Sequence, residues 1–168
     1  MAQAYFITFT TYGTWLPGSA KGSVDRAHNG YGTPFLKQDD ERQCQAQDRM
    51  SQAPYDMSAA EREVVCKAIV DLAEERGWRL LAVHVRSNHV HVVVSAEREP
   101  GRIMSDLKAR ASRDLTRAGF DGAERRRWTR HGSTKHLFTD DQVEAKIRYT
   151  LDAQGDRMAW YAKEPRTE

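Results

Sequence analysis

The sequence is poor in cysteine and in long apolar segments, and both shortages exclude certain classes of protein. Its 168 residues include only two cysteines, Cys44 and Cys66, too few for a disulfide framework and too far apart for a zinc site. No apolar run approaches the roughly 20 residues of a membrane span, and the mean hydropathy is −0.75. The first residues lack the pattern of a signal peptide. We therefore expect a cytoplasmic protein with no membrane partner and one domain-sized core.

Positive charge is concentrated in one segment, although the whole chain has a net charge of only +2. Residues 100–136 contain ten Lys/Arg and four Asp/Glu, a net charge of +6, which leaves −4 for the remainder. Such asymmetry favours a polyanion bound at one side of the molecule. Ordinary solvated helix faces would give the same counts, so both interpretations stay open.

Hydrophobic periodicity predicts the order β, α, ββ, α, β, α, with an additional short polar helix over 38–50. Strands are expected over 5–11, 78–85, 89–95 and within 128–138, and helices from Ser58, Pro100 and Thr139. The first six elements match the βαββαβ order of a ferredoxin-like α+β fold, an antiparallel sheet with helices on one face. A C-terminal helix follows, running through about Asp152. We expect one domain over 1–155 and an irregular C-terminal tail over 156–168.

Two histidines alternate in the strand predicted over 89–95. Side chains of a strand point alternately to its two faces, so His89 and His91 share one face while Val90 points to the other. Two imidazoles on one face can chelate a divalent metal. A cross-strand histidine pair on a solvated face is the competing interpretation.

Tyr149 stands apart from the apolar stripe of the last predicted helix. Val143, Ile147 and Leu151 recur at a spacing of four, and Tyr149 lies about 200° around the helix from Ile147. A phenol attacks a phosphodiester only when the phosphorus is positioned and polarised, which a metal held by two imidazoles does. The histidine pair and Tyr149 are thus a candidate unit for forming a covalent phosphotyrosine. The alternative is a surface tyrosine.

Two residues compete to be the third ligand of that metal. Asp152 lies about 60° from Tyr149 on a continued helix, and a carboxylate suits Mg²⁺ or Mn²⁺. Gln154 lies about 140° away and reaches the site only if the helix unwinds before Gly155. Asp152 could equally be a solvated residue of the last turn, although the helix dipole disfavours an anion there.

Four segments of the chain resemble the Y1 transposases of the IS200/IS605 type and the related REP-associated tyrosine transposases, which are single-domain HUH nucleases. The segments are residues 12–18 (YGTWLPG), 87–94 (SNHVHVVV), 128–135 (WTRHGSTK) and 148–155 (RYTLDAQG). The His-hydrophobe-His piece is moderately specific by itself. Its place upstream of a helix tyrosine is strongly specific.

The resemblance implies a metal-dependent single-stranded DNA endonuclease and strand transferase that acts near DNA hairpins in the bacterial cytosol, associated with the nucleoid. By motif position, His89 and His91 are metal ligands for Mg²⁺ or Mn²⁺, and Tyr149 is the nucleophile that forms a 5′-phosphotyrosine. Family members carry a glutamine ligand four residues after the tyrosine, where this chain has Ala153. Gln154 is therefore the preferred third ligand by residue type, and Asp152 the alternative. Both a homodimer and a monomer stay open.

DNA contacts are expected from the basic segment and from loops beside the histidine strand. Arginines can neutralise phosphates, and tryptophans can stack bases, although a tryptophan can equally pack in the core. The candidates are Trp15, Arg86, Asn88, Arg110, Arg113, Arg117, Arg127, Trp128, Arg130 and Lys135.

Two other functions compete with the nuclease. A non-catalytic or domesticated DNA-hairpin-binding protein would keep the fold, but the presence of both histidines and Tyr149 disfavours it. A metal-dependent hydrolase that uses water would need further ligands, such as a Glu-x-x-His motif, and does not explain the basic segment.

Overall fold

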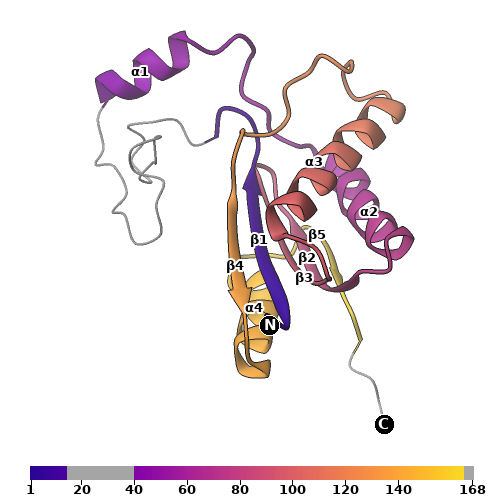
Figure 1. Ribbon diagram of the computed structural model, residues 1–168. Coiled ribbons are helices and arrows are strands. Elements are labelled where there is room, and N and C mark those ends of the chain that lie inside the picture. Colours follow the sequence, from indigo (N-terminus) through magenta and orange to yellow (C-terminus); the bar gives the residue numbers. More distant parts are fainter. Residues whose placement is uncertain (15–39, 165–168) are drawn as a thin grey trace.

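The computed structural model describes residues 1–14 and 40–164, and a five-stranded sheet forms its centre (Figure 1). The strands are β1 (Ala4–Thr10), β2 (Arg79–Val85), β3 (His89–Ser95), β4 (Ser133–Leu137) and β5 (Ala159–Ala162). The helices are α1 (Asp40–Asp48), α2 (Ala59–Glu75), α3 (Pro100–Arg117) and α4 (Asp140–Asp152). The sheet order is β4-β1-β3-β2-β5, with every neighbouring pair antiparallel. The ferredoxin-like α+β fold is confirmed.

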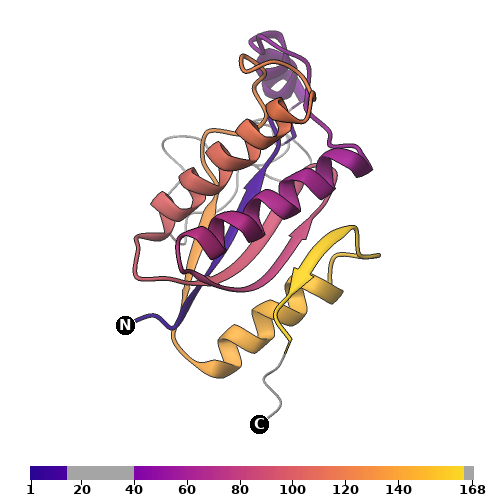
Figure 2. The ribbon, with the colours of Figure 1, turned by 90° about the vertical axis from the view of Figure 1, so that its right-hand side faces the viewer.

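The helices cover the two faces of the sheet unequally (Figure 1 and Figure 2). The α2 and α3 helices pack together on one face, over fully buried side chains that include Phe9, Val90 and Val92. The α4 helix packs on the opposite face, over Phe6 and Val93. Because neighbouring residues of a strand face opposite sides, the central strands β1 and β3 contribute buried apolar side chains to both faces. The predicted C-terminal helix is thus present, and it lies apart from the other two on its own face of the sheet.

Local sequence signals set the helix starts. Ser58 and Glu61 form a reciprocal capping box at α2, with the Ser58 N–H donating to the Glu61 carboxylate at 2.7 Å. The Glu99 carboxylate caps α3 ahead of Pro100, and the Thr139 hydroxyl caps α4. The predicted apolar stripe of α3 is buried throughout: Ile103, Leu107, Ala111 and Leu115.

None of the described helices is both long and apolar enough to cross a membrane.

The prediction of an irregular tail beyond Gly155 is wrong over Ala159–Ala162. These residues form β5, which pairs with β2 in the register His84↔Trp160 and Val85↔Ala159. Four residues are too few for a clear alternating pattern, and pairing with an existing strand supplies the stabilisation that their local sequence lacks. After α4 the chain therefore returns to the sheet and adds a strand beside β2, which lies next to the histidine strand β3.

Candidate active site

The two histidines lie on the central strand β3, between β1 and β2. His91 is 6% exposed and His89 is partly buried. In the register of the sheet, Thr8 of β1 and His84 of β2 are the direct neighbours of His91. Both imidazoles face the α4 side, as the alternation predicts.

Each imidazole is oriented by a polar group at its Nδ1 atom. The Asn88 Oδ1 atom lies 2.7 Å from His89 Nδ1, and the Thr8 hydroxyl lies 2.8 Å from His91 Nδ1. An amide oxygen only accepts hydrogen bonds, so His89 Nδ1 carries the proton and its Nε2 presents a lone pair. When His91 Nδ1 likewise donates to Thr8, both Nε2 atoms carry the lone pair that metal coordination requires. Such partners fix the ring orientation of metal-binding histidines.

Gln154 faces both histidines at these Nε2 atoms. Its Oε1 atom lies 3.4 Å from His89 Nε2 and 3.3 Å from His91 Nε2. With both imidazoles in the tautomer described, the three atoms are all electron-pair donors, and a shared cation relieves their mutual repulsion. Two neutral imidazoles and one amide oxygen are a fitting donor set for a divalent metal. In the described part of the chain no cluster of three His, Cys, Asp or Glu side chains offers another metal site.

Asp152, the alternative third ligand, points elsewhere. Its carboxylate accepts a hydrogen bond from the Arg157 guanidinium at 2.5 Å. Gly155 follows with a φ of +77°, a left-handed conformation that favours glycine. The helix thus ends at Asp152, and the turn that follows directs Gln154 to the histidines. This geometry favours Gln154.

Tyr149 lies at the rim of the same site. Its ring centroid is 5.7 Å from that of His91 and 5.8 Å from that of Phe6. The side chain is 40% exposed, and its hydroxyl forms no hydrogen bond within the described residues. The predicted core stripe of α4 packs behind it, with Leu151 buried and Ile147 partly buried. The phenol is therefore open to a substrate that reaches the histidine pair.

Burial keeps His91 neutral. It lowers the pKa of the imidazole to about 4, and the neighbouring His89 adds to this effect. A neutral imidazole is the form that binds metal. His91 is thus ready for coordination at neutral pH without first losing a proton.

His84 is a third histidine on this face, and no sequence motif selects it. It is fully buried, and burial lowers the pKa of its imidazole. Its Nε2 accepts a hydrogen bond from the Met158 N–H at 3.0 Å, and its Nδ1 donates to the Thr150 carbonyl at 2.9 Å. These two backbone groups flank the turn that carries Gln154. His84 therefore fixes both ends of that turn to the sheet.

Residues 56–147, more than half of the chain, match the family described as "Transposase IS200 like". The chain belongs to this transposase family. Two solved structures are similar to it in outline. One is a REP-associated tyrosine transposase bound to a REP hairpin, at 10% identity, a TM-score of 0.47 and coverage of 89% of this chain. This chain spans 66% of that protein's length. The other, assigned as a transposase, is from Deinococcus radiodurans: 15% identity, a TM-score of 0.45 and coverage of 92% of both chains. No curated protein matches this transposase.

Three residues predicted to contact DNA make contacts within the transposase itself. Arg127 is 2% exposed, and its guanidinium donates to the carbonyls of Phe120 and Ser112. Arg110 is held by a bidentate ion pair with Glu75 and by a hydrogen bond to Asp114. The third is Trp128, whose ring packs against Phe9 and whose indole N–H donates to Ser112. The charge count of the basic segment could not reveal that these groups are already paired.

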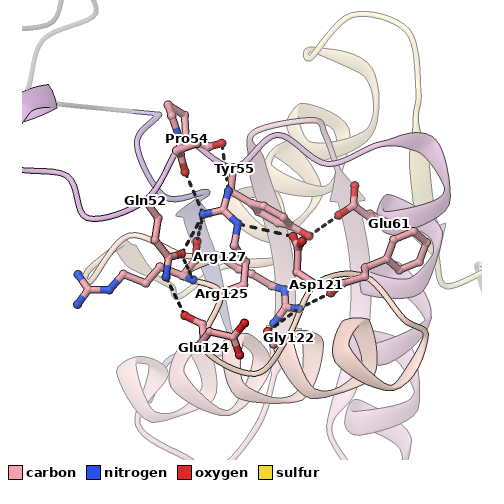
Figure 3. A network of polar contacts seen from close by, with 12 residues as sticks. Gln52, Pro54, Tyr55, Glu61, Asp121, Gly122, Glu124, Arg125 and Arg127 are labelled. Atoms are coloured by element: carbon pink, nitrogen blue, oxygen red, sulfur yellow. Dashed lines mark hydrogen bonds and ion pairs between the residues drawn. The ribbon is translucent and has the colours of Figure 1, made fainter.

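Arg125, in the loop between α3 and β4, also makes contacts within the protein. Arg125 donates to the carbonyls of Ala53 and Pro54 and lies over the ring of Tyr55, at 4.9 Å from its centroid (Figure 3). Asp121, Gly122 and Glu124 line an open pocket of about 410 Å³ together with Gln52 and Arg125. Arg125 thus connects the α3–β4 loop to the segment before α2.

The other DNA-contact candidates differ in position. Arg113 and Arg117 are exposed on α3, across the sheet from the histidines, and Arg117 lies near Asp114. Arg130 and Lys135 are exposed, and Lys135 is the neighbour of Phe6 on the histidine face. Arg86 donates to the Asp156 carbonyl at 3.0 Å and Asn88 orients His89, so both support the site. Trp15 lies outside the described residues.

Sequence reasoning missed Thr8 and His84 because neither belongs to a motif. Thr8 is one threonine among several in a β-branched strand, and only the β1–β3 register places it beside His91. His84 sits in an apolar strand, where a lone histidine has many structural explanations. The register of the hairpin formed by β2 and β3 decides whether His84 shares a face with His91. That register depends on the geometry of the turn, which the sequence alone does not give.

Proposed function

We propose that this transposase is a metal-dependent single-stranded DNA nuclease and strand transferase in which Tyr149 is the nucleophile. The observation that carries this proposal is the convergence of three donor atoms, His89 Nε2, His91 Nε2 and Gln154 Oε1, beside an accessible phenol. Its substrate would be single-stranded DNA next to a hairpin, as the family resemblance implies.

The two histidines and Gln154 would hold Mg²⁺ or Mn²⁺. A bound metal of this kind stabilises negative charge on the non-bridging oxygens of a phosphodiester. Thr8 and Asn88 keep the imidazoles in the orientation that presents Nε2, and the buried His91 stays neutral because charging it is unfavourable there. The chain supplies a preorganised site, so little rearrangement is needed before reaction.

Tyr149 would attack the phosphorus from the rim of this site. The new bond joins its phenolic oxygen to phosphorus, and the bond from phosphorus to the 3′-oxygen breaks. The phenol gives up one proton and the leaving 3′-oxygen takes up one, so the products are a 5′-phosphotyrosine and a free 3′-OH. One phosphoester replaces another, which keeps the step reversible and permits rejoining without an external energy source.

The test is a covalent-adduct assay. Labelled single-stranded DNA with a hairpin and a randomised flank is incubated with protein and Mg²⁺ or Mn²⁺, then separated on denaturing gels. We expect a protein–DNA adduct that disappears in Tyr149→Phe and persists in Tyr161→Phe, a matched control on the far strand β5. We expect His89→Ala to abolish the adduct while hairpin binding is largely retained.

Three outcomes would contradict the proposal. Cleavage that survives in Tyr149→Phe means that water is the nucleophile and the protein is a hydrolase. Binding without cleavage under either metal means that it is a non-catalytic hairpin-binding protein. Equal loss of binding and cleavage in His89→Ala removes the catalytic role assigned to that histidine.

A further inference from the structure

Lys146 lies one turn before Tyr149 on α4 and is not part of the donor cluster described above. Its Nζ atom is 4.8 Å from the centroid of the Tyr149 ring and 4.9 Å from that of Phe6. The Phe6 ring in turn stacks on His91, at a centroid distance of 5.4 Å and an interplanar angle of 20°. The ammonium group is therefore held between two aromatic rings at the entrance to the histidine site.

The charge of Lys146 is uncompensated within the described part of the chain. Its neighbour on the same helix, Arg148, forms an ion pair with Glu144, whereas no carboxylate of the described residues pairs with Lys146. A cation over two rings gains some stabilisation from their quadrupoles, but this leaves its hydrogen-bond donors available. An anion can reach it without first displacing an acidic side chain of the described residues.

A second lysine faces the same place from the sheet. Lys135 of β4 is the direct antiparallel neighbour of Phe6, and direct neighbours project to the same face. Lys135 is exposed. Phe6 is thus flanked by positive charge from β4 and from α4, on the side of the histidine pair where Tyr149 lies.

We propose that Lys146 binds the phosphate group that Tyr149 attacks, with Lys135 contacting the adjoining phosphate of the same strand. This inference rests on the proposed function of Tyr149. The ligand is the phosphodiester backbone of single-stranded DNA, recognised by charge and not by base. Beside the nucleophile, the Lys146 ammonium neutralises a non-bridging phosphate oxygen whose negative charge grows during attack. The same oxygen remains charged in the phosphotyrosine.

The first test measures binding alone. In a Tyr149→Phe background, which cannot form the adduct, the affinity for a short fluorescent oligo-dT is measured across a range of salt concentrations. Each phosphate contact contributes about −0.7 to the slope of the logarithm of the association constant against the logarithm of the salt concentration for single strands. We expect Lys146→Met to make this slope less negative by about 0.7, and Lys146→Arg to leave it unchanged. Methionine retains the apolar stem, so thermal unfolding serves as the check that folding is unchanged.

The second test measures adduct formation with Tyr149 intact. Removing one charge-stabilising donor from a reacting centre costs about 100-fold in rate, which is the loss we expect for Lys146→Met. The matched control is Lys67→Met, which removes the same charge from α2, on the other side of the sheet. A slope and an adduct rate for Lys146→Met equal to those of Lys67→Met would overturn the inference. Absence of any adduct in the wild-type protein would instead refute the proposed function, and the oligo-dT slope would still decide the role of Lys146.

Discussion

Replacing His84 by phenylalanine tests whether the histidine that supports the active-site turn is needed for stability and for metal binding. The ring is fully buried and bonds two backbone groups, the Thr150 carbonyl and the Met158 N–H. Phenylalanine fills a similar volume, so the substitution removes both hydrogen bonds while creating little cavity. What remains is the buried Thr150 carbonyl and the part-buried Met158 N–H, with no partner from residue 84.

The expected cost follows from those two groups. A buried polar group left without a hydrogen bond costs about 1–3 kcal/mol, so loss of the Thr150 partner should lower the free energy of unfolding by about 1–3 kcal/mol. The part-buried Met158 N–H adds at most a similar amount. The matched substitution His136→Phe lies on the edge strand β4 at an exposed position. It should change stability by no more than about 0.5 kcal/mol.

The same substitution should weaken the metal site, because the turn between Thr150 and Met158 carries Gln154. Loss of a group that positions a metal ligand typically lowers metal affinity about 10–100-fold. Urea unfolding measures the stability of both variants, and calorimetric titration with Mn²⁺ under folding conditions measures the affinity. A stability loss below about 1 kcal/mol, together with unchanged Mn²⁺ affinity, would refute the assignment of His84 as the support of this turn.

Three further predictions concern acid stability, the third ligand and the basic segment. Burial lowers the pKa of His91 from 6.5 to about 4, so the unfolded chain takes up its proton first as the pH falls. The free energy of unfolding of the metal-free protein should therefore be highest above pH 6.5 and fall by at most about 3 kcal/mol towards pH 4. Urea unfolding midpoints measured in EDTA test this, and midpoints that do not change with pH would contradict the burial argument. Gln154→Ala should weaken Mn²⁺ binding at least about tenfold, whereas Asp152→Ala should leave it nearly unchanged, and the reverse result would make Asp152 the ligand. Arg127→Met should destabilise the fold by about 3 kcal/mol or more, while Arg113→Met should stay within about 0.5 kcal/mol; equal urea midpoints would show that Arg127 is not structural.

Much of the fold was predictable because its signals are local. The capping box at Ser58, Pro100 after a carboxylate cap, and the stripe from Ile103 to Leu115 each act within a few turns of one helix. Strand alternation likewise places His89 and His91 on one face, because it depends only on their spacing. β5 escaped prediction because its four residues owe their conformation to pairing with β2.

The candidate site was only partly predictable, for the same reason. Residue type and spacing selected Tyr149 and the histidine pair, and left Gln154 and Asp152 as rivals. An unbroken helix favours Asp152, whereas the end of α4 and the left-handed Gly155 turn Gln154 to the histidines. In the opposite sense, charge counting selected Arg127, although the fold buries that guanidinium among carbonyl groups.

The sequence by itself thus determined which chemical groups are present and which of them share a strand face or a helix turn, because a strand and a helix have fixed periods. Only the tertiary structure decided which groups meet across elements. Sheet register brings Thr8 and His84 to His91, and packing of α4 on that face brings Tyr149 and Lys146 to the site. Register and packing depend on contacts between residues far apart in the chain, and no local pattern specifies them.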